Sequence, residues 1–391
     1  MSSSPLEVSG ARARRRVWVR ILVTAIVVLA VIAIAAGIAV ARLSANVTTV
    51  DLGSAADDDA DVADYSGSFD LLLVGSDGRD GQGAQYGEGG DVTGARNDVT
   101  LVLHVNENHD RATVISLPRD LLVDLPDCTD PASGRIVPGG AGIQFNEALE
   151  RGGLGCVASA VESLTGTSMR YAAEISFQGV IDLSHTVGGV PVCFGGAIDD
   201  PHSGLVIPGA GTYDLEGEQA LALLRSRHGV GDGSDLARIS SQQVFMSGLA
   251  RKLQDEATFT DLVKLYSIAD VATKNSTLST DLADPLTMVS MGKTLAGLPL
   301  DAMTFVTYPY LPAGDRVVPD EAAAEQLLGL IDADQPILLD ANNLGRGQTL
   351  EEATAKSEPD ADADADADQH ATLPENVDGQ SADERTCVIP F

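Results

Sequence analysis

Lysine, cysteine and familiar metal-binding spacings are scarce in this chain of 391 residues. Lysine and arginine together number 25 against 57 aspartates and glutamates, so the formal net charge is −32. Such a charge repels a polyanion and excludes a general nucleic-acid binder. The four cysteines are too few for a disulfide scaffold, and they include no CxxC pair that would mark a zinc site. A hydrophobic content of 44% excludes a wholly disordered chain.

Several catalytic signatures are also absent. The chain has no GxxxxGK[ST] sequence and is therefore not a P-loop NTPase. The stretch at 75–78 lacks the GxSxG order of a nucleophile elbow, and the six histidines show no HExxH motif or other metal-ligand spacing. Carboxylates and arginines are therefore the residues on which we base the predicted chemistry.

An uncharged apolar segment near the N-terminus predicts a membrane anchor. Residues 1–20 carry five arginines and one glutamate, and residues 21–41 contain no charged side chain. About 20 apolar residues suffice to cross a bilayer as a helix, and the basic end stays in the cytoplasm. A cleaved signal peptide is the alternative, but its apolar region usually spans only about 7–15 residues. We expect a single-pass protein of the cell membrane, with a cytoplasmic tail (1–20), a transmembrane helix (21–41) and an extracellular remainder.

Composition divides this remainder into three parts. Residues 42–68 are rich in Asp, Ala and Ser and indicate a solvated acidic stalk. Residues 69–340 carry strand and helix patterns and are the predicted folded domain. Residues 341–391 contain the self-repelling repeat DADADADAD and are predicted to be a disordered tail, with the last residues docking back on the domain. Calcium binding by the repeat is the alternative, although nothing folds it into a cage.

The patterns within 69–340 predict an α/β fold with a mixed central sheet flanked by helices. Strands are expected at 69–75, 99–105, 112–117 and 304–307, with two more around Gly188-Gly189. Helices are expected at 146–164, 215–224, 235–253, 260–271, 284–296 and 320–330. Strands that are joined by hairpins and mixed with helices are typical of a mixed sheet.

The four cysteines predict two disulfides, because an even number on the oxidising side of a membrane favours pairing. Of the three possible arrangements we expect Cys128 with Cys156 and Cys193 with Cys387. The second bond would pin the C-terminus to the sheet. A catalytic cysteine is the alternative, but none has a histidine beside it.

Arginines next to acids carry the predicted chemistry. The first lysine is Lys252, so every earlier base is an arginine, whose planar fork binds phosphate or carboxylate with two hydrogen bonds. Four clusters lie at the ends of predicted elements, where open α/β sheets form ligand sites. The clusters are Gly75-Ser76-Asp77-Gly78-Arg79, Arg96-Asn97-Asp98, Leu117-Pro118-Arg119-Asp120, and Arg225-Ser226-Arg227 with Asp235, Arg238, Gln242 and Gln243.

Together the clusters predict a diphosphate site with a magnesium ion. Asp77 and Asp98 are hard oxygen ligands, and Mg²⁺ usually takes one or two carboxylates plus phosphate oxygens. The diphosphate would lie among four arginines: Arg96, Arg119, Arg225 and Arg227. The alternative for any one cluster is a surface Arg–Asp pair worth about 0–1 kcal/mol. Four such clusters at element ends favour a site.

These stretches resemble the LytR-CpsA-Psr family of cell-wall glycopolymer transferases. The resemblance covers about 69–336, behind a single-span anchor, and rests on FDLLLVGSDGR, ARNDVTLVLHVN, ATVISLPRDLLVDLP, FNEALERGGLGC and LEGEQALALLRSRHGVGDGSDLARISSQQ. It implies transfer of a phosphorylated glycopolymer from a polyprenyl-diphosphate carrier in the membrane lipid bilayer to peptidoglycan, with Mg²⁺ on the diphosphate.

By motif position, the resemblance assigns roles to single residues. Asp77 and Asp98 match the family's metal-binding acids. Its diphosphate-binding and catalytic arginines match Arg119, Arg225 and Arg227. Further diphosphate ligands are expected at Arg79, Arg96, Arg238, Gln242 and Gln243. Asp98 or a nearby acid would be the base for the acceptor hydroxyl. This chain has Ser241 where the family usually has an arginine before the glutamines.

Two other functions would use the same residues. A pyrophosphatase or phosphodiesterase would pass the phosphoryl group to water instead of a glycan. A non-catalytic envelope regulator would bind polymer without Mg²⁺. The acids Asp77 and Asp98 argue against the regulator, because two carboxylates weaken the binding of a polyanion unless a cation lies between them.

Overall fold

The structure is a computed structural model and describes residues 8–52, 67–77, 95–254, 262–339, 343–351 and 377–391. The chain divides into two compact units, Met1–Asn46 and Val47–Phe391. The described part of the first unit is one helix, α1 (Val8–Asn46). Among the described residues, no helix combines the length and the apolar character that crossing a membrane requires.

An eight-stranded mixed sheet forms the centre of the second unit, in the order β1-β14-β9-β2-β3-β4-β15-β19. Its strands are β1 (Thr48–Val50), β2 (Phe69–Ser76), β3 (Asn97–Val105), β4 (Ala112–Ser116), β9 (Tyr171–Ser176), β14 (Ser276–Ser279), β15 (Met303–Thr307) and β19 (Gly379–Ser381). β2 runs parallel to β9, β4 runs parallel to β15, and β3 runs antiparallel to both β2 and β4. The predicted mixed central sheet is confirmed.

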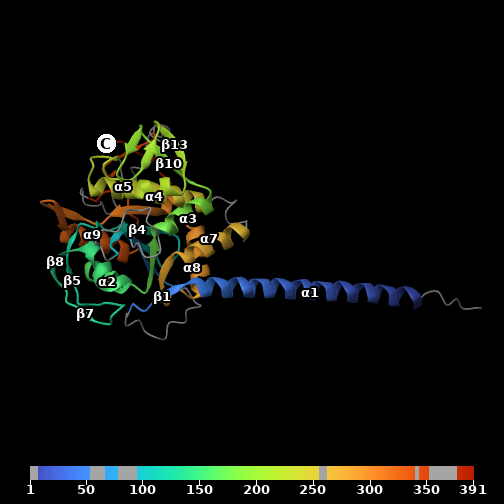
Figure 1. Cartoon of the computed structure of the whole chain (residues 1–391). Helices are drawn as coiled ribbons and strands as arrows, with labels where there is room; N and C mark the ends of the chain where they lie inside the picture. The colour runs from blue at the N-terminus through green and yellow to red at the C-terminus, as the bar shows by residue number, and fades with distance from the viewer. Residues whose placement is uncertain (1–7, 53–66, 78–94, 255–261, 340–342, 352–376) are drawn as a thin grey trace, which may run out of the picture. The chain divides into compact units, whose positions relative to one another are not determined.

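Helices cover both faces of this sheet, because neighbouring strand residues point to opposite faces. Leu72 of β2 belongs to a core that includes α2 and α9, whereas its neighbour Leu71 belongs to a core that includes α5 and α8. Figure 1 shows α2 and α9 on one side of the sheet and α7 and α8 on the other. These helices are α2 (Ala148–Thr165), α5 (Asp235–Gln254), α7 (Leu262–Lys274), α8 (Pro285–Gly297) and α9 (Glu321–Asp332).

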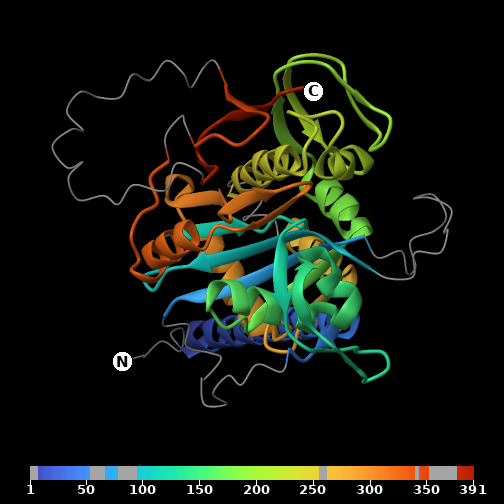
Figure 2. The ribbon, with the colours of Figure 1, turned by 90° about the vertical axis from the view of Figure 1, so that its left-hand side faces the viewer.

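A second sheet of four strands, in the order β13-β10-β20-β18, holds the C-terminus. Its strands are β10 (Val190–Phe194), β13 (Gly211–Leu215), β18 (Gln348–Leu350) and β20 (Thr386–Val388). Figure 2 shows the C-terminal segment in red beside the green strands of this sheet. The disulfide Cys193–Cys387 joins β10 to β20, with Cα atoms 4.4 Å apart. Cys128–Cys156 is the second disulfide, so both pairings are those that the sequence favoured.

The remaining elements lie in the connections. They are β5 (Leu122–Leu125), β6 (Cys128–Thr129), β7 (Ile136–Val137), β8 (Gly140–Gln144), η2 (Phe145–Glu147), α3 (Phe177–Val187), β11 (Ile198–Asp200), β12 (Leu205–Ile207), α4 (Glu218–Arg225), η3 (Leu300–Ala302), β16 (Tyr310–Ala313) and β17 (Arg316–Pro319). Helix α2 is kinked near its start, because Gly152 and Gly153 have non-helical dihedral angles.

Helix α3 was not expected, since the sequence suggested only strands around Gly188-Gly189. The Ser176 side chain accepts a hydrogen bond from the Gly179 amide and caps the start of the helix. Gly188 ends it with a φ of 78°, a left-handed conformation that favours glycine. Two strands are present, β9 and β10, but a helix of 11 residues separates them.

The prediction that 341–391 is a disordered tail is wrong for 343–351 and 377–386, whereas the expected docking of the last residues is confirmed, since Cys387 and Val388 pair with β10. The two described segments form β18, β19 and β20, because their apolar side chains are buried; Val377 and Val388 are both 0% exposed. The acidic repeat at 360–368 lies outside the described residues. The prediction of a stalk at 42–68 is wrong in its first part, since α1 continues to Asn46 and β1 pairs with β14 in the central sheet. Its acidic stretch at 53–66 is not described.

Candidate active site

Strand direction brings the predicted site residues to one edge of the central sheet. The parallel strands β2, β4, β9 and β15 all end at this edge, and the antiparallel strand β3 begins there. Asp77 directly follows β2, Asp98 is the second residue of β3, and Arg119 lies three residues beyond β4. The carboxyl ends of strands are the usual ligand-binding edge of an open α/β sheet.

Arg119 lies between two carboxylates. Its Nη1 donates a hydrogen bond to Asp98 Oδ1, and its Nε donates to Asp235 Oδ1 at 3.1 Å. Burial by itself lowers the pKa of Arg119, but the charges of Asp98 and Asp235 outweigh burial and raise the pKa above its ordinary value. Arg119 is therefore a fixed cation whose direction the two acids set.

Asp235 connects Arg119 to a second, more deeply buried arginine. Arg238 Nη2 lies 2.7 Å from Asp235 Oδ1 and donates to the backbone oxygen of Asp98 at 3.1 Å. Burial lowers the pKa of Arg238, against the charge of Asp235 and together with the charges of Arg119 and Arg227. Among the described residues, Asp235 Oδ2 and Arg238 Nε are buried without a hydrogen-bond partner. Buried polar atoms usually have hydrogen-bond partners, so these two atoms are available to bond a bound group.

Asp77 and Arg96 form the neighbouring part of the edge. Asp77 Oδ1 accepts a hydrogen bond from the Arg96 amide at 2.7 Å, and the Asp77 amide donates to the Arg96 carbonyl at 3.3 Å. The Arg96 side chain is 47% exposed and lies 3.6 Å from Glu150. These bonds hold Asp77 beside the start of β3, which carries Asp98. Arg79 lies outside the described residues.

Arg225 is the last residue of α4, and Arg227 lies two residues beyond the helix. The Arg225 guanidinium lies 4.9 Å from the ring centroid of Phe177, within the range of a cation–π contact. Because Phe177 directly follows β9, this contact brings Arg225 to the same edge of the sheet. Ser226, between the two arginines, is fully buried and donates to Asp200 Oδ2 at 2.7 Å, which anchors the segment.

The two predicted glutamine ligands bind protein atoms. Gln242 Nε2 donates to the Leu224 carbonyl at 2.9 Å and so ties α5 to α4. Gln243 is 1% exposed, and its Nε2 donates to Thr307 Oγ1 at 3.2 Å, which ties α5 to β15. Ser241 is buried and donates to the Ala237 carbonyl within the same helix. The role of the glutamines as diphosphate ligands stays a prediction.

Three residues without a predicted ligand or catalytic role lie at this edge. Asp235 is in the sequence cluster, and its spacing of three residues from Arg238 on a helix signals a pair. Glu174 interrupts an apolar strand, which is a signal of its own; burial raises its pKa, although a hydrogen bond with Ser76 opposes this. No sequence pattern points to Phe177, since a lone aromatic residue at a helix start is ordinary.

The carboxylates fit a magnesium ion that also binds phosphate. Among the described residues, no group of three or more His, Cys, Asp or Glu could hold a metal ion. Asp77 and Asp98 are two carboxylates at adjoining strand ends, and Mg²⁺ commonly takes one or two carboxylates, with phosphate and water oxygens completing its shell. The unpartnered Arg238 Nε offers a further donor for an anion. The residues present therefore suit a magnesium–diphosphate group better than a metal held by protein alone.

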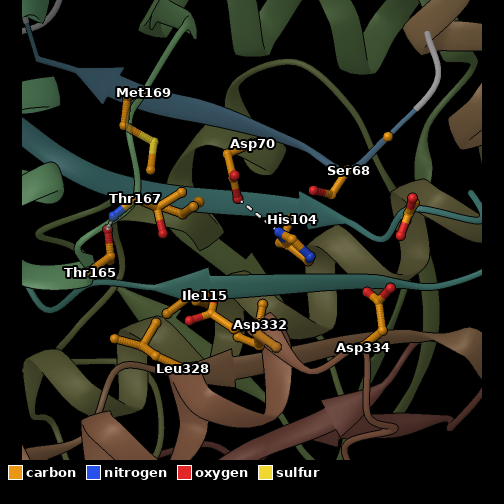
Figure 3. A pocket seen from close by; sticks show the side chains of 14 residues that line it. Ser68, Asp70, His104, Ile115, Thr165, Thr167, Met169, Leu328, Asp332 and Asp334 are labelled. Carbon is orange, nitrogen blue, oxygen red and sulfur yellow. Dashed lines mark hydrogen bonds and ion pairs between the residues drawn. The ribbon is translucent and has the colours of Figure 1, made fainter.

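A separate cavity of about 340 Å³ lies toward the other end of β2 and β3. Figure 3 shows Asp70 and His104 facing each other in this cavity, with Asp70 Oδ1 3.0 Å from His104 Nδ1. None of the predicted site residues lines it. The candidate active site is therefore the arginine–carboxylate edge and not this cavity.

The fold and this edge define the class: an α/β domain with a mixed central sheet whose carboxyl edge carries linked arginines and carboxylates. Residues 39–327 match the model of the LytR_cpsA_psr family, and the chain belongs to this family. The resemblance that the motifs indicate is thereby confirmed.

Two relatives of the chain are named for work on the cell wall. The cell wall biosynthesis protein LcpA of Corynebacterium glutamicum is 31% identical over 273 residues, which cover 64% of this chain and 51% of that protein. The chain therefore spans about half the length of LcpA. The polyisoprenyl-teichoic acid–peptidoglycan teichoic acid transferase TagT of Bacillus subtilis is 26% identical over 252 residues, or 63% of this chain and 70% of TagT.

A solved structure shares the fold. The LytR-Csp2A-Psr enzyme from Actinomyces oris superposes with a TM-score of 0.54 at 20% identity, covering 73% of this chain and 96% of that one.

Proposed function

We propose that this protein is a phosphotransferase that moves a glycopolymer phosphate from a polyprenyl-diphosphate carrier onto peptidoglycan in cell-wall assembly. The observation that carries the proposal is the linked set Asp98, Arg119, Asp235 and Arg238 at the carboxyl edge of the sheet. Phosphoryl transfer spreads negative charge over phosphate oxygens, so prepositioned cations are its main catalytic requirement. The names of TagT and LcpA support the substrate class.

In this proposal, Arg119 and Arg225 stabilise the charge that develops on the diphosphate. Asp98 and Asp235 hold Arg119, and the Phe177 ring supports Arg225, so neither arginine needs to reorganise during the reaction. The remaining diphosphate ligands are proposed to be Arg79, Arg96, Arg227, Arg238, Gln242 and Gln243.

A magnesium ion is part of the proposal. Asp77 and Asp98 would hold it, and it would neutralise negative charge on the diphosphate. The acceptor hydroxyl needs a base, and we propose Asp98 or another carboxylate of this edge. Because Asp98 is bonded to Arg119, Glu174 is the alternative base; burial raises its pKa.

We also propose that the chain is anchored in the cell membrane by residues 21–41, with residues 1–20 in the cytoplasm and the catalytic domain outside. The anchor segment contains no charge, and its large side chains Ile21, Ile26 and Ile34 are more than half exposed on α1. An oxidising compartment agrees with the two disulfides. After cell fractionation, the full chain should require detergent for release, whereas residues 47–391 alone should stay in the soluble fraction. A full chain released by salt alone would contradict the anchor.

Transfer by the purified full chain in detergent tests the function. The assay supplies polyprenyl-diphosphate glycan and peptidoglycan fragments, with and without Mg²⁺. We expect Arg119→Ala and Arg225→Ala each to lower kcat by about 10²–10³-fold with unchanged circular dichroism, because each removes a cation that acts in the transition state. Arg135→Ala, at an exposed arginine of the β6–β7 turn, is the matched control.

The products separate the candidate functions. Polymer linked to peptidoglycan supports the transferase, whereas free polymer phosphate would identify a pyrophosphatase or phosphodiesterase. Binding without turnover would identify an envelope regulator. Near-parental turnover by the Arg119 and Arg225 variants would refute their assigned roles.

A further inference from the structure

Three basic side chains meet in a second pocket, beside the four-stranded sheet. This pocket has a volume of about 230 Å³, and its charged lining residues are Arg251, Lys252, Arg385 and Glu351. The chain as a whole has 25 basic and 57 acidic residues. The lining of this pocket has three basic residues and one acidic residue, so its charge is opposite in sign to that of the chain. The bases come from distant segments: Arg251 and Lys252 lie in the last turn of α5, and Arg385 immediately precedes β20.

The fold positions these cations through backbone oxygens. Arg251 Nη1 donates to the Ala382 carbonyl at 2.5 Å and to the Glu384 carbonyl at 3.3 Å. Lys252 Nζ donates to the Gly188 carbonyl at 3.2 Å. A carbonyl oxygen directs a charged donor but does not cancel its charge. The positive charge of Arg251 is thus built into the pocket and remains available to a ligand.

Like charges approach one another in this pocket. Burial lowers the pKa of Arg251, and the charge of Arg385 lowers it further, despite the opposing charges of Asp383 and Glu351. Arg385 is 67% exposed and lies 3.9 Å from Glu351, and a surface pair of this kind is worth about 0–1 kcal/mol. An anion between the arginines would relieve their repulsion.

The frame of the pocket is rigid. Cys193 lines it and is bonded to Cys387, and β20 pairs with both β10 and β18. Thr212 and Thr386 also line the pocket, and the Thr386 hydroxyl is fixed by donating to Gln380 Oε1 at 2.6 Å. These features describe a preformed recess for a small anion.

We infer that this pocket binds an anionic group, a phosphate or a carboxylate, on a sugar unit of the glycopolymer. The inference rests on the proposed function and adds a second contact for its substrate. Pockets for drug-sized molecules measure about 300–1,000 Å³, so this smaller recess suits one charged sugar unit. Arg and Lys side chains are the usual partners of such oxyanions.

Helix α5 links this pocket to the candidate active site. Arg238 lies in the first turn of the helix, and Arg251 follows thirteen residues later. At a rise of 1.5 Å per residue, about 20 Å separates them along the helix axis. Thirteen residues also turn the helix by about 220°, so the two arginines leave it on different faces. A polymer that contacts both places would pass around α5, and the pocket would contribute to substrate binding and not to the chemical step.

Binding of small sugars to the full chain in detergent tests the inference. The probes are glucose 6-phosphate, glucuronate and neutral glucose, titrated by calorimetry at low salt in an Arg119→Ala background that weakens the active site. Lys252→Gln with Arg385→Gln should weaken binding of the charged sugars by about tenfold or more. The matched control, Arg135→Gln with Lys293→Gln, removes two exposed bases elsewhere and should leave binding unchanged. Glucose should not bind.

Transfer kinetics separate this inference from the proposed function. With Arg119 intact, the Lys252 and Arg385 double variant should raise KM for the lipid-linked polymer more than it lowers kcat. Unchanged sugar binding and unchanged KM would overturn the inference but leave the transferase intact. Binding that depends on both bases, in a protein without transfer activity, would refute the function and leave an anion site. Sugar binding only after deletion of 360–368 would make the chain's own acidic repeat the occupant and overturn the inference.

Discussion

Replacement of Asp235 by Asn is the sharpest test of the candidate site's construction. Asp235 Oδ1 lies 3.1 Å from Arg119 Nε and 2.7 Å from Arg238 Nη2, so one carboxylate serves two arginines. The substitution removes the negative charge and replaces one carboxylate oxygen with an NH2 donor. Because Oδ1 contacts both arginines and Oδ2 has no partner, the side-chain oxygen of Asn can keep both contacts while the NH2 group takes the place of Oδ2. Any loss of stability then reports the electrostatic role of the carboxylate.

The expected loss follows from burial. Arg238 is 3% exposed, and removal of one partner from a buried ion pair costs about 3–5 kcal/mol because the other charge remains buried. Arg238 keeps its bond to the Asp98 carbonyl, and Arg119 keeps the Asp98 carboxylate. We therefore expect the lower end of this range, about 3 kcal/mol.

Urea denaturation of the parent and of Asp235→Asn measures this loss directly. Asp232→Asn is the matched control, because Asp232 and Arg346 are 3.4 Å apart with about half of each side chain exposed. That surface pair should contribute at most about 1 kcal/mol. Combining Asp235→Asn with Arg238→Met should recover part of the loss, since no buried charge is then left unpaired. Equal losses for Asp235→Asn and Asp232→Asn would refute the reasoning.

Two further predictions concern pH and cross-links. Burial raises the pKa of Asp200, but hydrogen bonds from Ser226 and Ser203 outweigh burial and hold the pKa below its ordinary value of 3.8. The resulting stabilisation is present above this unfolded-state pKa and is lost as pH falls through the folded-state pKa. The urea midpoint should consequently fall less between about pH 6 and pH 3 in Asp200→Asn than in the parent, and an equal fall would contradict the assignment. Removal of Cys193–Cys387 should cost about 2 kcal/mol more than removal of Cys128–Cys156, because the bonds close loops of 194 and 28 residues. Urea unfolding of the two paired Cys→Ser variants measures the difference, and the reverse order would refute the loop argument.

Local patterns in the sequence determined much of the central sheet and the membership of the site. The apolar runs at β2, β3 and β4 identify these strands, because burial on both faces selects continuous apolar residues. Pro118 marks the end of the strand that precedes Arg119, since proline cannot donate to a neighbouring strand. A strand followed by an arginine and an acid is a pattern within a few residues that indicates a site. Such a pattern can be recognised without any knowledge of the fold.

Only the tertiary structure decided which charges meet. The bonds from Arg119 to Asp98 and Asp235 join residues 21 and 116 positions away, because antiparallel pairing of β3 and β4 and packing of α5 bring three segments together. The three-residue strand β20 likewise contains too few residues to be recognised as a strand, although the expected Cys193–Cys387 bond predicted that this segment docks on the domain. It is ordered by pairing with β10 and β18 and by a disulfide to Cys193, all of which are contacts with distant residues. Local patterns report the preferences of a segment, whereas pairing and burial between distant segments depend on the order of strands in the folded sheet.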